Sequence, residues 1–70
     1  MLVRASSAHV ERDPKDKKLH VHIHVGAEVI KRPLPKTAEG ADEDALRSVA
    51  IETAKDEGYE VDPGKVAIQQ

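Results

Sequence analysis

The clearest pattern along the chain is the strict alternation of residues 19–25, LHVHIHV. Aliphatic residues take every second position: Leu19, Val21, Ile23 and Val25. Histidines take the positions between them: His20, His22 and His24. Because successive side chains of a strand point to opposite faces, the pattern predicts a β-strand over residues 18–25 with one aliphatic and one histidine-bearing face.

A weaker extended pattern precedes this strand, over residues 2–12. The sequence DPKD at 13–16 is a strong turn signal, so the two segments predict an antiparallel hairpin. With a four-residue loop, three cross-strand pairs follow: His9 with His20, Ser7 with His22, and Ala5 with His24. The polar face then carries all four histidines of the chain. A slip of one residue would move the whole first strand's set to the other face.

Extended character continues beyond Gly26 towards Pro33. One straight strand over 19–32 would span about 46 Å at ~3.3 Å per residue, whereas a globule of this length is roughly 28 Å across. The strand must therefore bend, break or reach a partner, and Gly26 is the expected position of a bulge or bend. Pro33 and Pro35 end any central pairing.

Helical spacing is found between Asp42 and Gly58. Asp42 is the expected N-cap, and acidic residues follow it in the first turn. Gly58 is the expected stop, so the helix should run to about Glu57. The residues of its apolar stripe are Leu46, Val49, Ala50, Thr53 and Ala54. Ile51 lies off this stripe and is expected at the surface.

The last part of the chain predicts extended structure interrupted by one turn. Tyr59 and Val61 begin an extended segment, DPG at 62–64 marks a turn, and 65–69 is a short strand. The order β-β-α-β predicts a single small α+β domain over residues 1–70. We expect two layers, with one helix packed on a small antiparallel sheet, or on a mixed one.

Composition limits how this domain is stabilised and where it acts. The chain is 39% hydrophobic and 34% charged, as in soluble folded proteins, but Tyr59 is its only aromatic residue and it has no cysteine. Small domains are commonly stabilised by disulfides, metals or oligomerisation. Without cysteines, a metal or self-association remains as the means of stabilising this one. The net charge of -2 favours neither nucleic acid nor an anionic membrane. With neither a signal peptide nor a membrane-spanning segment in the sequence, we expect a cytoplasmic protein.

The histidines are the candidates for metal chemistry. Imidazole nitrogens hold Zn²⁺ at about 2.0–2.1 Å, and side chains two residues apart on a strand lie roughly 6.6 Å apart, so an H-x-H pair can chelate one ion. His20 and His24 are about 13 Å apart by the same rise, too far to share it comfortably. The candidate ligands are His9, His20, His22 and His24, and His9 opposite His20 favours the trio with His22.

Three functions stay open, and enzymatic activity is not expected. The leading hypothesis is a non-enzymatic domain that acts through protein association as a homodimer; its candidate interface residues are His20, His22, His24 and Ile51. Charged imidazoles would repel, so such an interface could be pH-sensitive. The second hypothesis is binding of a Zn-type divalent ion. Ser7 near His22 lacks an orienting acid and an oxyanion motif, so it does not predict a nucleophile.

The third hypothesis is an accessory role in nucleic-acid binding. Basic residues that could contact phosphate gather in the turn and before the prolines: Lys15, Lys17, Lys18, Lys31 and Arg32. No aromatic residue is interleaved with them for base stacking, and the helix carries acidic charge. A soluble hairpin tip and a charged strand edge account for the same residues.

Overall fold

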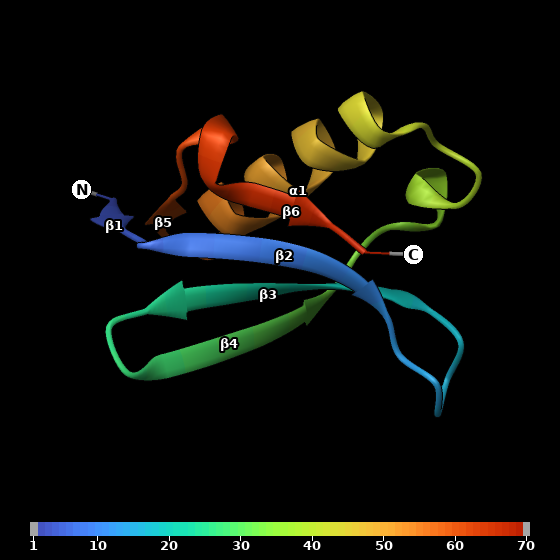
Figure 1. The fold of residues 1–70 in the computed structure, drawn as a ribbon, viewed down its shortest axis with the longest axis horizontal. Helices are drawn as coiled ribbons and strands as arrows, with labels where there is room; N and C mark the ends of the chain where they lie inside the picture. The colour runs from blue at the N-terminus through green and yellow to red at the C-terminus, as the bar shows by residue number, and fades with distance from the viewer. Residues whose placement is uncertain (1, 70) are drawn as a thin grey trace.

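A four-stranded sheet forms one layer of the fold, with β2 and β3 at its centre (Figure 1). The computed structural model describes residues 2–69. The spatial order of the strands is β4 (Glu28–Pro33), β3 (Leu19–Val25), β2 (Ser7–Arg12) and β6 (Val66–Ile68). The two hairpin pairings are antiparallel, whereas β2 and β6 are parallel. One helix, α1 (Glu43–Asp56), packs on this mixed sheet, which confirms the predicted α+β class.

Shorter elements extend the predicted order. A parallel pair consists of β1 (Val3–Arg4) and β5 (Tyr59–Glu60), and two 3₁₀ turns lie at η1 (Lys36–Ala38) and η2 (Pro63–Lys65). The prediction of one continuous strand over 2–12 is wrong, because the chain bends between β1 and β2, at Ser6. The N–H of Ala5 donates to the carbonyl of Glu60 at 2.9 Å, and that of Ser6 donates to the carbonyl of His24 at 2.8 Å.

The core lies between the sheet and α1. Alternate residues of β2 and β3 form the sheet side of the core: Ala8, Val10, Leu19, Val21 and Ile23, all buried. The buried helix residues are Leu46, Ala50 and Ala54. The two alanines lack bulk, so the helix backbone can lie close to the sheet. The aliphatic face predicted for residues 18–25 is therefore the core-facing side.

The long extended run breaks at Gly26 as expected. Val25 pairs with Glu28, which leaves Gly26 and Ala27 as a two-residue turn between β3 and β4. Gly26 has φ +60°, the conformation that a type II′ hairpin turn requires at its first central position. The residues after Gly26, which would have made a single strand too long for the domain, thus fold back as β4 and pair with β3.

The predicted register of the first hairpin is wrong by two residues. Arg12 pairs with Leu19, so the loop spans residues 13–18 rather than 13–16. Two aspartates account for the longer loop: Asp13 Oδ1 accepts from the N–H of Lys15 at 2.8 Å, and Asp16 Oδ1 accepts from that of Lys18 at 2.9 Å. A shift of two leaves every side chain on its predicted face and changes its partner across the strands.

The helix begins and ends where the sequence predicts. Asp42 Oδ1 accepts a hydrogen bond from the N–H of Ala45 at 2.8 Å, and Gly58 follows the helix with φ +92°. Ile51, expected at the surface, is instead half-buried against the core. The reason is β5, which adds Tyr59 to the apolar surface beside the helix.

We expect Asp42→Ala to lower the free energy of unfolding by about 1 kcal/mol, because an N–H of the first helical turn loses its acceptor. Asp42→Asn keeps an oxygen at the same place and should cost only a few tenths of that. Urea denaturation followed by circular dichroism measures both variants. Equal losses in the two variants would contradict a capping role for the Asp42 side chain.

Candidate metal centre

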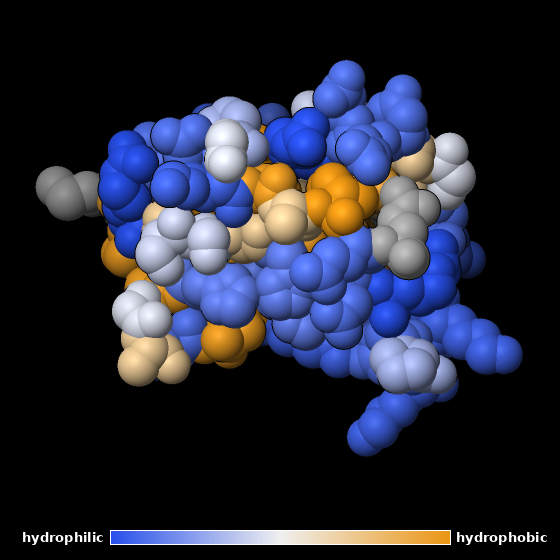
Figure 2. Space-filling view, viewed as in Figure 1, coloured by the Kyte–Doolittle hydropathy of each residue, from blue (hydrophilic) through white to orange (hydrophobic). Residues whose placement is uncertain are grey.

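The sheet face opposite α1 carries the histidines. The observed register places His9 of β2 beside His22 of β3, and Ser7 beside His24. Because the aliphatic residues of both strands face the helix, these side chains face away from it. Figure 2 looks onto this part of the molecule, and the surface over the middle of β2 and β3 is hydrophilic there.

On this face, the imidazole of His9 contacts those of His22 and His24. The rings of His9 and His22 stack with centroids 4.4 Å apart, at 25° between their planes. On the other side of His9, its Nδ1 lies 3.0 Å from Nε2 of His24. One of these two nitrogens must carry the proton and the other must accept it. His9 is therefore the central ring of the group.

Glu11 completes a group of three metal-binding side chains. Its Oε2 lies 3.4 Å from Nε2 of His9. His9, Glu11 and His22 each offer one candidate ligand atom, and these three atoms lie within 4.8 Å of one another. Two ligands that share a tetrahedral Zn²⁺ at 2.0–2.1 Å are themselves about 3.3 Å apart. We call His9, Glu11 and His22 the sheet-face triad.

Glu11 was missed at the level of sequence, although a signal for it was present. It follows His9 by two residues on the same strand, so both side chains must share a face. Only histidines were predicted as ligands. In the structure, the three triad residues are half-buried, and they lie on the paired strands β2 and β3.

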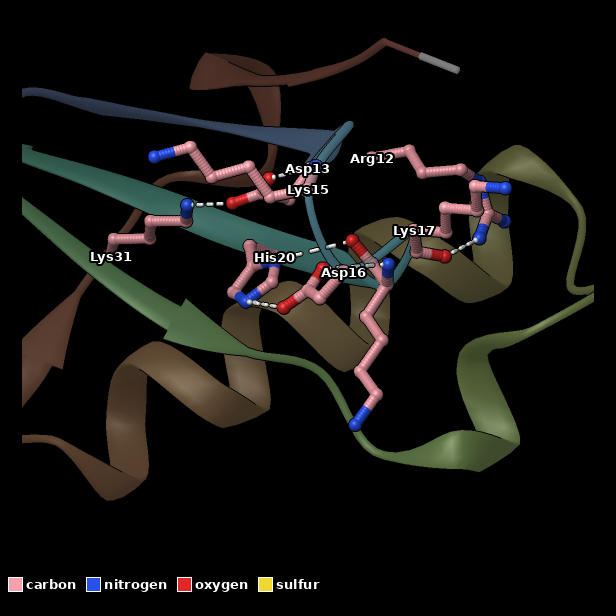
Figure 3. A network of polar contacts seen from close by, with 8 residues as sticks. Arg12, Asp13, Lys15, Asp16, Lys17, His20 and Lys31 are labelled. Carbon is pink, nitrogen blue, oxygen red and sulfur yellow. Dashed lines mark hydrogen bonds and ion pairs between the residues drawn. The ribbon is translucent and has the colours of Figure 1, made fainter.

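His20 lies opposite Glu11 of the triad rather than opposite His9, but its ring nitrogens contact the loop of residues 13–18 instead of the triad. The residue is only 7% exposed, with the loop of residues 13–18 beside it (Figure 3). Its Nδ1 is 3.1 Å from the carbonyl of Lys18, so this nitrogen carries the proton and donates it. Its Nε2 is 3.5 Å from Asp16 Oδ2. His20 thus belongs to the loop network.

Asp13 links this loop to β4. Asp13, Asp16 and His20 bring ligand-type atoms within 4.8 Å of one another, but Asp13 Oδ2 already accepts a hydrogen bond from the ammonium of Lys31 (Figure 3). This bond lowers the pKa of Asp13 from 3.8 to about 2, and it raises the pKa of Lys31. The loop group is therefore bound to a cation of the chain itself.

Burial and the neighbouring His9 lower the pKa of His22 from its ordinary value of 6.5. Burial is the larger cause, because a charged imidazole loses hydration when it is half-covered. His22 is consequently neutral at physiological pH. The neutral imidazole is the form that binds metal ions, so no proton has to leave His22 first.

The other candidate residues are spread over several surfaces. Lys31 and Arg32 point to opposite faces of β4, and Arg32 Nε donates to Glu57 Oε1 at 2.9 Å. Of the basic residues proposed for nucleic acid, Lys31 and Arg32 thus lie on different faces of the sheet. Of the proposed interface residues, His22 and His24 lie on the open sheet face, His20 is buried, and Ile51 lies on the helix.

Comparison with protein families, curated proteins and solved structures finds no match to this chain. Within residues 2–69, no helix combines the length and the apolar character needed to cross a membrane. Among residues 2–69, two groups bring metal-binding atoms within 4.8 Å of one another: the sheet-face triad and the loop group of Asp13, Asp16 and His20.

We expect Asp13→Asn to destabilise the protein near neutral pH, because the ion pair with Lys31 is lost. The asparagine oxygen still accepts from the N–H of Lys15, so the change isolates the charge. A carboxyl whose folded pKa is depressed stabilises the fold fully above its unfolded value of 3.8, and this contribution disappears as pH falls through about 2. Urea denaturation across that range should show the two proteins converging.

Lys31→Gln removes the same ion pair from its other side and serves as the matched variant. Its stability should follow the same pH profile as that of Asp13→Asn. If the difference in unfolding free energy from the unmodified protein stays constant down to pH about 2, the charge of Asp13 does not cause that difference.

Proposed function

We propose that this protein binds a divalent transition-metal ion of the Zn²⁺ type through the sheet-face triad. The observation that carries the proposal is that atoms of His9, Glu11 and His22 lie within 4.8 Å of one another on two paired strands. Two imidazoles and one carboxylate form a ligand set that zinc proteins use. Such sets leave a fourth position to water or to another ligand.

Rigidity of the scaffold supports this proposal. β2 and β3 are the two inner strands of the sheet, so each is hydrogen-bonded to a neighbour on both sides. His9, Glu11 and His22 are all half-buried on these strands, which limits the rotamers open to their side chains. Side chains that are already ordered lose little conformational entropy when they bind an ion.

His24 has a distinct role in the proposed site. Since His9 Nε2 is the nitrogen near Glu11, Nε2 is the nitrogen that would bind the metal. His9 Nδ1 would then donate its proton to Nε2 of His24, 3.0 Å away. Outer partners of this kind fix the tautomer and the direction of a ligating imidazole. His24 is thus proposed as a positioning residue rather than a ligand.

The donor types also indicate which ions would bind. Imidazole suits Zn²⁺, Cu²⁺ and Ni²⁺, whereas Ca²⁺ and Mg²⁺ prefer sites built from oxygen. The triad has two nitrogen donors and one carboxylate, and the chain has no cysteine to favour softer ions. We therefore propose selectivity for late first-row transition ions over Ca²⁺ and Mg²⁺.

We expect isothermal titration calorimetry with zinc to give one saturable site. His9→Ala and His22→Ala should each abolish it or weaken it by more than the roughly 10–100-fold loss typical of an outer-shell substitution. His24→Ala should fall within that 10–100-fold range, because it removes only the acceptor that orients His9.

His20→Asn is the matched control, since it changes a neighbouring histidine of the same strand that lies outside the triad. Its zinc affinity should equal that of the unmodified protein, and circular dichroism confirms that each variant is folded. Zinc binding that survives His9→Ala and His22→Ala but is lost in His20→Asn would refute the triad as the site. Titration with calcium should give no saturable heat.

A further inference from the structure

Two neighbouring surface hollows share Pro33 and Leu34, at the end of β4. One, of about 670 Å³, lies between segment 33–35 and α1. The other, of about 440 Å³, is bordered by Pro33 and Leu34, by the β2–β3 loop and by Lys36 and Glu39 at η1. Leu34 is half-buried against the core, and its N–H donates to the carbonyl of Leu19 at 2.9 Å. The segment is therefore a fixed apolar border between the two hollows.

The hollow beside α1 is acidic. Glu52, Asp56 and Glu57 line it, and Glu57 is paired with Arg32 at 2.9 Å. Glu52 and Asp56 are exposed and form no ion pair within residues 2–69. Two acids of this hollow's border are thus unpaired, and they lie next to the apolar side chains of Leu34 and Val49.

The placement of these acids is unfavourable for the isolated chain. Glu52 and Asp56 are four residues apart on α1, where like charges repel. Asp56 also lies in the last turn, at the negative end of the helix dipole. Both penalties would be relieved by cations from outside the helix. Local choices that oppose the fold's own stability are expected where a surface has a binding role.

The hollow beside the β2–β3 loop has the opposite charge. Lys17, Lys18 and Lys36 line it, all exposed, and none of them forms an ion pair with the described part of the chain. Its one acid, Glu39, is paired with Arg12 at 2.9 Å. One continuous surface therefore has an acidic half, an apolar middle and a basic half.

We propose that this surface binds a second copy of the chain, with the acidic hollow of each copy against the basic hollow of the other. A twofold axis through segment 33–35 exchanges the two halves, so the charges match twice in one symmetric contact. The exposed Pro33 and Pro35 then meet their counterparts at the centre. This dimer differs from the predicted one, because its contacts lie away from the histidine face, and it does not depend on metal binding.

Charge reversal with complementation tests the proposal. The acidic half is reversed in Glu52→Lys with Asp56→Lys, and the basic half in Lys18→Glu with Lys36→Glu. The oligomeric state is measured by sedimentation equilibrium at about 1 mM protein and low salt, because these conditions populate even a weak complex. The unmodified chain should be dimeric and each reversed protein monomeric. An equimolar mixture of the two reversed proteins should return to the mass of a dimer.

Matched controls reverse equal numbers of charges elsewhere. Glu28→Lys with Glu60→Lys, and Lys15→Glu with Lys65→Glu, carry the same net charges as the two test proteins and should stay dimeric. Recovery in the mixture also shows that both test proteins are folded. A monomeric unmodified chain, a dimer that survives either test reversal, or a mixture that stays monomeric while both test proteins are folded by circular dichroism would each overturn the proposal.

Discussion

The antiparallel pairing of β2 with β3 is the interaction on which both faces of the fold depend. Val10 pairs with Val21 and His9 pairs with His22 on consecutive rungs of the same ladder. Because side chains alternate, the rung that seals the core is followed at once by the rung that brings the imidazoles together. The core and the candidate metal centre therefore share one register, and neither can shift without the other.

Local patterns were enough to predict the histidine strand, the break at Gly26 and both ends of α1. Each is decided by residues close together in sequence: alternation, one glycine, a capping aspartate. The loop of 13–18 was not predicted, because its length depends on side-chain hydrogen bonds of Asp13 and Asp16 and on Lys17 at φ +59°. The β1–β5 and β2–β6 pairings join distant segments, and no local pattern specifies such pairs.

The candidate site was predicted as a face but not as a set of contacts. Face membership depends only on whether a position is odd or even, so the error of two residues left all four histidines together. Contacts across the strands depend on the full register, so the same error put His20 where His22 lies. The closeness of Glu11 to His9 does not depend on the register, because both residues lie on β2. Composition indicated that a small core without cysteines would be stabilised further by a metal or by self-association. The sheet-face triad is proposed for the metal, and the surface around segment 33–35 is proposed for self-association.

The triad comes wholly from one hairpin, and this has a consequence for the order in which structure can be gained. Contacts between β2 and β3 close a short loop, whereas the parallel pairing that joins Ala8 to Val66 must close nearly the whole chain. Loop-closure entropy makes the distant pairing the slower step. The two strands that carry the proposed ligands can therefore align before β6 completes the sheet, so an ion held there would act on folding as well as on the folded protein.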